Sequence, residues 1–131
     1  MKWAMLAILV VLAGCASTIH PVVELDPAQA KTLIDQKENL GLFVLNVHTP
    51  YEGKLDGTDA FIEDWENVVA HEDILPKDKH QPILLYCRTG RMSSSAGKQL
   101  QALGYTKIYH LTGGMKAWDA QGLPIIEKSW R

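Results

Sequence analysis

Two runs of apolar residues, each as long as one β-strand, constrain the fold of this 131-residue chain most strongly. Residues 42–47 and 82–86 contain no charged side chain, which is typical of strands buried on both faces of a sheet. Segments compatible with helices alternate with these runs, and we expect a third strand over residues 107–111. The alternation predicts an α/β fold in which helices cover both faces of a small parallel sheet.

The expected helices are recognised by the residues at their ends. Asp26 suits a helix N-cap and Pro27 the first helical position, while Gly104 and Gly122 suit helix ends. We expect helices over residues 28–37, 70–75, 93–103 and 114–121. Right-handed crossovers would then bring the loops that follow the strands together at one edge of the sheet.

A cysteine directly follows the second apolar run. The segment reads Cys87-Arg88-Thr89-Gly90-Arg91-Met92-Ser93, so a short loop leads from a strand into a helix. Such a loop turns its backbone N–H groups toward one centre, and the helix N-terminus adds partial positive charge. Gly90 permits backbone angles that are closed to other residues, and both arginines can hold oxyanions.

These features are expected to act on the Cys87 thiol. A free cysteine is only about 3% thiolate at neutral pH, and a helix N-terminus with neighbouring cations increases that fraction. We therefore predict that Cys87 is a catalytic nucleophile and that residues 88–93 bind the anion it attacks. The alternative is a buried structural cysteine beside solvated arginines.

The first fifteen residues differ in composition from the rest. Lys2 precedes the apolar run of residues 3–13, and eleven helical residues span only about 17 Å of the roughly 30 Å of a bilayer core. The sequence Leu12-Ala13-Gly14-Cys15 resembles the lipobox of bacterial lipoproteins. The resemblance implies a signal peptide over residues 1–14 and a lipid on Cys15. A plain signal peptide, or a short uncleaved anchor with an incidental Cys15, is the alternative.

This assignment predicts the organisation and location of the chain. Residues 15–21 would be a tether and residues 22–131 a single domain at the periplasmic face of the cell envelope. Ala16 in place of Asp favours the outer membrane in Gram-negative lipoproteins. If Cys15 carries a lipid, Cys87 has no disulfide partner in the chain.

Composition disfavours other classes of function. The formal net charge is −2 and the sequence has no run of Lys or Arg, so nucleic acid is not an expected partner. The five histidines have no metal-ligand spacing, and we expect no metal site. His48 follows a strand and could face the site, but its position alone does not identify it as catalytic.

Three cysteine chemistries fit an anion-binding loop. A cysteine phosphatase needs an arginine at the sixth position after the cysteine, where this chain has Ser93. An arsenate reductase needs further thiols to resolve its intermediate. A sulfurtransferase needs one cysteine, whose thiolate takes the outer sulfur of a donor and passes it to an acceptor.

Residues 81–124 resemble a single-domain rhodanese. The similarity rests on the sequence from Pro82 to Ser93 (PILLYCRTGRMS), on residues 104–105 and 108–114 (GY and IYHLTGG), and on Trp118, Gly122 and Pro124. It implies the rhodanese fold, a persulfide on Cys87 without any other cofactor, and loop amides from Arg88 to Met92 around it. It also implies thiosulfate or another small anionic sulfur donor, with cyanide or a thiol as acceptor.

The first half of the chain departs from the rhodanese pattern. Asn46-Val47-His48 stands where the family usually has Asp-Val-Arg, so we expect an ion pair near the site to be lost and the sulfur donor or the rate to differ. A thiol protein of the periplasm is as suitable an acceptor as a small thiol. The alternative function is a sulfur carrier or regulatory persulfide-binding module with little turnover, and a cysteine phosphatase ranks below both.

Overall fold

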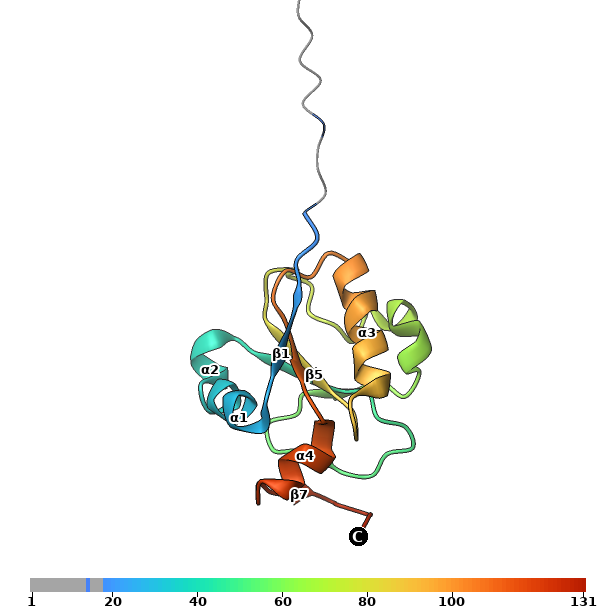
Figure 1. Cartoon of the computed structure of the whole chain (residues 1–131). Coiled ribbons are helices and arrows are strands. Elements are labelled where there is room, and N and C mark those ends of the chain that lie inside the picture. The colour runs from blue at the N-terminus through green and yellow to red at the C-terminus, as the bar shows by residue number, and fades with distance from the viewer. Residues whose placement is uncertain (1–13, 15–17) are drawn as a thin grey trace, which may run out of the picture.

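A five-stranded parallel sheet lies at the centre of the molecule (Figure 1). The computed structural model describes Gly14 and residues 18–131. The strands are arranged in the order β1-β6-β5-β2-β4, and each pairs in parallel with its neighbours. This architecture confirms the expected α/β class. The strands are β1 (Val22–Leu25), β2 (Phe43–Asn46), β4 (Ala60–Phe61), β5 (Ile83–Tyr86) and β6 (Ile108–Leu111).

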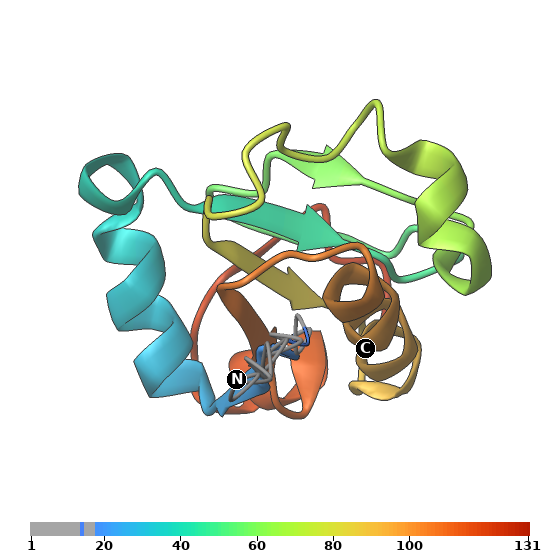
Figure 2. The same cartoon turned by 90° about the horizontal axis from the view of Figure 1, so that it is seen from above.

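Helices cover both faces of this sheet (Figure 2). One face carries α3 (Arg91–Ala102) and the 3₁₀ helix η1 (Trp65–His71). The other face carries α1 (Pro27–Asp35), α2 (Lys37–Leu40) and α4 (Gly114–Ala120). Neighbouring residues of one strand serve opposite faces, since Leu85 packs in the core under α3 and Leu84 in the core under α1 and α4.

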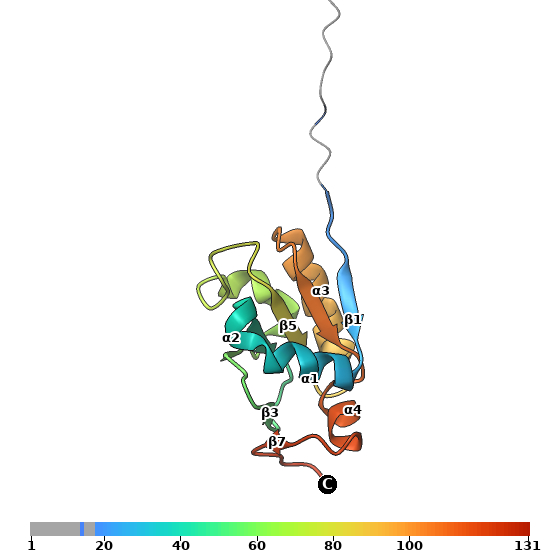
Figure 3. The same cartoon turned by 90° about the vertical axis from the view of Figure 1, so that its left-hand side faces the viewer.

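A small antiparallel sheet closes the end of the domain near α4 (Figure 3). It pairs β3 (Lys54–Leu55) with β7 (Ile125–Ile126), and so joins the loop after β2 to the C-terminal segment. The hydroxyl of Tyr86 anchors this region, because it accepts a hydrogen bond from Leu55 N at 3.1 Å and lies 2.7 Å from Thr58 Oγ1. Burial raises the pKa of Tyr86 to about 12.

The first helix begins as expected and ends earlier. Asp26 and Gln29 form a reciprocal capping box, with hydrogen bonds of 2.8 and 3.0 Å, and Pro27 occupies the first helical position. The expected helix 28–37 breaks at Gln36, where the backbone leaves the α-helical geometry of α1 before α2 begins.

Two other helices begin earlier than expected. The helix expected over residues 70–75 is instead η1, where Gln99 accepts from Val68 N and donates to Trp65 O. Similarly, α3 begins at Arg91 rather than Ser93, because Gly90 with φ of 112° turns the chain directly into the helix. Arg91 and Met92 therefore belong with Ser93 to its first turn and not to the loop.

The sequence did not predict the short strands β1, β3, β4 and β7. β1 is an edge strand with exposed Val23 and Glu24, so it lacks the continuous apolar signal of the central strands. The predicted signal peptide and Cys15 fall outside the described residues except for Gly14. Within the described part of the chain, no helix combines the length and apolar character needed to cross a bilayer.

Candidate active site

The loops after β5 and β6 meet at one edge of the sheet, as the parallel arrangement predicts. Cys87 follows β5, and the N-terminus of α4 donates to the loop from Met115 N to Cys87 O and from Lys116 N to Arg88 O, both at 2.9 Å. This approach requires Gly114, which has φ of +60°. A Cβ atom there would lie 2.5 Å from Cys87 O.

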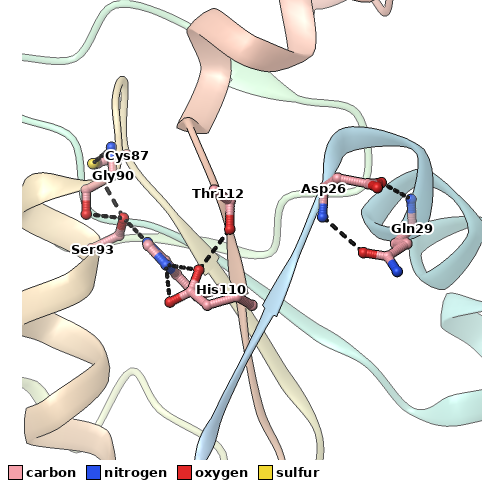
Figure 4. Close-up of polar contacts among 8 residues, drawn as sticks. Asp26, Gln29, Cys87, Gly90, Ser93, His110 and Thr112 are labelled. Atoms are coloured by element: carbon pink, nitrogen blue, oxygen red, sulfur yellow. Dashed lines mark hydrogen bonds and ion pairs between the residues drawn. The ribbon is translucent and has the colours of Figure 1, made fainter.

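Two donors hold the Cys87 sulfur. The side chain is 1% exposed, and its Sγ accepts hydrogen bonds from Gly90 N at 3.0 Å and from Ser93 Oγ at 3.2 Å (Figure 4). Gly90 ends the loop, and the fully buried Ser93 lies in the first turn of α3. Donors directed at sulfur stabilise a thiolate more than a thiol, so this arrangement suits a nucleophilic sulfur.

An open cleft of about 370 Å³ is lined in part by Cys87. The predicted site residues gather here: four of them line the cleft with Cys87, while Gly90 and Ser93 bond to its sulfur. His48 after β2 also lines the cleft, as its position after a strand allowed, and Lys116 on α4 is a further lining residue that the sequence did not identify. The cleft-lining residues are His48, Cys87, Arg88, Thr89, Arg91, Met92 and Lys116.

Aromatic rings hold both arginines of the cleft. The Arg91 guanidinium lies over the Trp65 ring at 5.6 Å, and that of Arg88 over the Trp130 ring at 5.5 Å. Arg88 also pairs with Glu52, with 3.3 Å between Nη1 and Oε2. Stacking and ion pairing fix long side chains that would otherwise be mobile, so the positive charge beside the cleft is held in place.

Asn46 is uncharged and forms no ion pair with His48, and both residues instead contact the loop after β2. Asn46 Nδ2 donates to Gly53 O at 3.1 Å, and its Oδ1 accepts from His48 N at 2.9 Å. His48 Nε2 lies 2.6 Å from Glu52 Oε2, the same oxygen that pairs with Arg88. Glu52 therefore connects the β2 loop to the cysteine loop.

Comparison with known proteins assigns the chain to a family. Residues 27–121, more than half of the chain, match the family model of the rhodanese-like domain. The chain belongs to the rhodanese-like domain family. The expected family resemblance is thereby confirmed, and it extends beyond residues 81–124 into the N-terminal half.

Several proteins named as sulfurtransferases are similar to this rhodanese-like chain. A sulfurtransferase of Allochromatium vinosum is 40% identical over 52 residues, which are 40% of this chain and 47% of that protein. The thiosulfate sulfurtransferase GlpE of Pseudoalteromonas translucida is 26% identical over 101 residues, 77% of this chain and 92% of the relative. The polysulfide-sulfur transferase homodimer of Wolinella succinogenes is similar in structure, with a TM-score of 0.66 and 27% identity over 82% of this chain and 80% of that one.

Rhodanese-like relatives with other names also match. A tRNA uridine(34) hydroxylase of Nitrobacter winogradskyi is 30% identical over 113 residues, covering 83% of this chain but 43% of the relative. The chain spans between 31% and 54% of the length of this and three other curated relatives. The shared part therefore identifies a rhodanese-like domain and leaves the activity to be argued from the site.

A polar network that runs from the buried Ser93 and His110 to the exposed Glu24 and Thr112 was also missed from the sequence. Ser93 Oγ lies 2.6 Å from His110 Nε2, and His110 Nδ1 lies 2.8 Å from Glu24 Oε2. Thr112 Oγ1 donates to the same Glu24 oxygen at 2.7 Å. Glu24 and His110 are partners in the β1–β6 register, so the signal for this contact lies in strand pairing and not in local sequence.

Proposed function

We propose that this rhodanese-like chain is a sulfurtransferase that carries sulfur as a persulfide on Cys87. The donor would be thiosulfate or another small anion with a sulfane sulfur, and the acceptor a thiol or cyanide. The observation that carries the proposal is Cys87, which lines an open cleft and whose Sγ accepts hydrogen bonds from Gly90 N and Ser93 Oγ.

The reaction divides into two displacements at sulfur. In the first, the Cys87 thiolate attacks the sulfane sulfur of thiosulfate, forming a new S–S bond, while the S–S bond of the donor breaks and sulfite leaves with the electron pair. In the second, cyanide or an acceptor thiolate attacks the outer sulfur of the persulfide. Cys87 leaves as a thiolate, so the cycle needs no oxidant, reductant or other cofactor.

The charges around the cleft favour an anionic donor. Arg88, Arg91 and Lys116 line the cleft, and cations close to a developing sulfite stabilise its charge. Thr89 and Met92 complete the wall. We assign these side chains to donor binding, and Gly90 and Ser93 to holding the sulfur that attacks and later leaves.

A sulfur carrier with little turnover would use the same contacts, and an assay separates the two functions. The full chain is tested for thiocyanate formation from thiosulfate and cyanide, with Cys87→Ser as the control. Catalytic turnover that Cys87→Ser abolishes supports the enzyme. Stoichiometric loading of Cys87 without turnover favours the carrier.

The phosphatase alternative has less support from the site. The position where a cysteine phosphatase needs its arginine holds Ser93, whose hydroxyl donates to the Cys87 sulfur. Hydrolysis of an aryl phosphate by the chain, absent in Cys87→Ser, would revive this alternative.

We also propose that a lipid on Cys15 anchors the domain at the periplasmic face of the envelope, through residues 15–21. The start of β1 at Val22 supports a domain of residues 22–131 behind such a tether. In that location the acceptor would be a thiol protein of the periplasm. Metabolic labelling with a fatty acid tests the anchor. Label that persists in Cys15→Ala would contradict it.

A further inference from the structure

Four side chains form one hydrogen-bonded chain from the Cys87 sulfur to the protein surface (Figure 4). Ser93 Oγ lies 3.2 Å from Cys87 Sγ and 2.6 Å from His110 Nε2. His110 Nδ1 lies 2.8 Å from a carboxylate oxygen of Glu24. Cys87, Ser93 and His110 are almost fully buried. The Glu24 side chain is 57% exposed.

Ser93, His110 and Glu24 have the order and the contacts of a hydrolytic Ser-His-Glu triad. A hydrolase needs an accessible serine oxygen, and Ser93 is 0% exposed. Its hydroxyl lies against the sulfur of Cys87, a residue that lines the cleft. The geometry therefore connects the histidine and the carboxylate to the cysteine through the serine.

We propose that His110, positioned by Glu24, takes up the Cys87 proton through the Ser93 hydroxyl and so maintains the nucleophile of the proposed sulfur transfer. While the sulfur is a thiol, it donates to Ser93 Oγ, and the hydroxyl donates to neutral His110 Nε2. The thiol proton then moves to Ser93 Oγ as the hydroxyl proton moves to Nε2. A thiolate and an imidazolium result, with no proton gained from or lost to solvent. The Ser93 hydroxyl now donates to the thiolate, which is the direction of this hydrogen bond in the structure.

Glu24 and Thr112 prepare His110 for this role. The Glu24 carboxylate accepts from Nδ1, which directs Nε2 toward Ser93 and stabilises the charged imidazolium. Thr112 Oγ1 donates to Glu24 at 2.7 Å and fixes the carboxylate. His110 and Glu24 do not contact the reacting sulfur, so they are positioning residues.

Other titratable and charged groups line the cleft with Cys87 and are not part of this hydrogen-bonded series. His48, Arg88, Arg91 and Lys116 line the cleft with the cysteine. His110 itself faces Glu24 on β1, Ser93 on α3 and the Gly90 end of the loop. Substitution of His110 leaves the cations of the cleft in place, so it isolates the contribution of the relay.

The rate of Cys87 alkylation by iodoacetamide, followed across pH in the full chain, tests the proposal. In His110→Gln the amide can hydrogen-bond to Ser93 but cannot take up a proton. We expect alkylation roughly tenfold slower than in the parent at neutral pH, because a cation next to the thiolate is lost. At pH about 10 the two rates should converge, since solvent base then forms the thiolate in both proteins.

His80→Gln is the matched control, because His80 is an exposed histidine whose Nδ1 contacts Thr106 Oγ1 at 3.1 Å. It precedes β5, whereas Cys87 follows that strand, and its profile should equal that of the parent. An unchanged profile in His110→Gln would overturn the relay. A rate lowered by the same factor at every pH would also overturn it, since that pattern indicates a structural role alone.

Glu24→Gln keeps the test decisive if His110→Gln does not fold. Glu24 is largely exposed, so this variant should fold, and we expect a smaller slowing in the same direction, again confined to neutral and lower pH. A parent-like profile in Glu24→Gln would then contradict the proposal. Alkylation needs no sulfur donor. If the His110 variant alkylates as expected but the parent chain transfers no sulfur, the proposed function is overturned and the relay is not.

Discussion

Substitution of Gly114 by alanine tests how the N-terminus of α4 shapes the cysteine loop. Gly114 has φ of +60°, and a Cβ there would meet Cys87 O at 2.5 Å and both the carbonyl carbon and oxygen of Arg88 at 2.6 Å. These are backbone atoms, so a rotamer change cannot relieve the contact. Either the loop or the helix must move.

The structure supplies a matched control for the backbone angle. Gly41 has φ of +64°, and no described atom lies within 4 Å of its Cβ position. Alanine at Gly41 should therefore cost only the strain of the left-handed conformation, about 1–2 kcal/mol. Alanine at Gly114 adds a steric term of about 1–3 kcal/mol, for a total loss of about 2–5 kcal/mol in the free energy of unfolding.

Urea denaturation and Cys87 alkylation measure the two consequences. We expect Gly114→Ala to lose more unfolding free energy than Gly41→Ala. Its folded state should also alkylate differently, because a shifted Cys87 backbone moves Sγ relative to Gly90 N. Gly41→Ala should alkylate like the parent. Equal losses of stability in the two variants, with unchanged alkylation in both, would refute the steric argument.

Two further predictions concern stability. The pKa of Tyr86 is raised from 10 to about 12 by burial, so the neutral form stabilises the fold below pH 10, and that stability is lost as the pH rises from 10 to 12. The free energy of unfolding should fall by about 3 kcal/mol. Urea denaturation at several pH values in this range should show a smaller fall in Tyr86→Phe, and equal falls in the two proteins would contradict the assignment to Tyr86. Asp26→Ala removes the capping box with Gln29 and should lower the unfolding free energy by about 1 kcal/mol, and no change in the urea midpoint would show that the cap contributes nothing.

The central strands and the cysteine loop were predictable because local sequence specifies them. Strands that are buried on both faces need no polar side chains, so the continuous apolar runs of residues 42–47 and 82–86 indicated central strands. The position of Cys87 between such a strand and a helix then placed a thiol at the sheet edge. The contacts of Gly90 and Ser93 with its sulfur follow from that local geometry.

The contacts missed from the sequence depend on pairing between distant segments. Glu24 and His110 are 86 positions apart and meet because β1 and β6 are in register. β1 is an edge strand whose two exposed residues are adjacent, so buried and exposed positions do not alternate along it. Trp130 likewise reaches Arg88 because β7 returns the chain to β3, and neither two-residue strand is visible as a pattern.

Sulfur transfer by this site is tested most simply by the mass of the Cys87 peptide after reaction with a sulfur donor. The full chain is incubated with thiosulfate, freed of excess donor and measured intact and as peptides, beside Cys87→Ser. We expect a gain of one sulfur atom on the peptide containing Cys87, reversed by cyanide with release of thiocyanate and absent in Cys87→Ser. A chain that remains unmodified with thiosulfate, polysulfide and other sulfane donors, while its thiol still alkylates, would contradict sulfur transfer by this site.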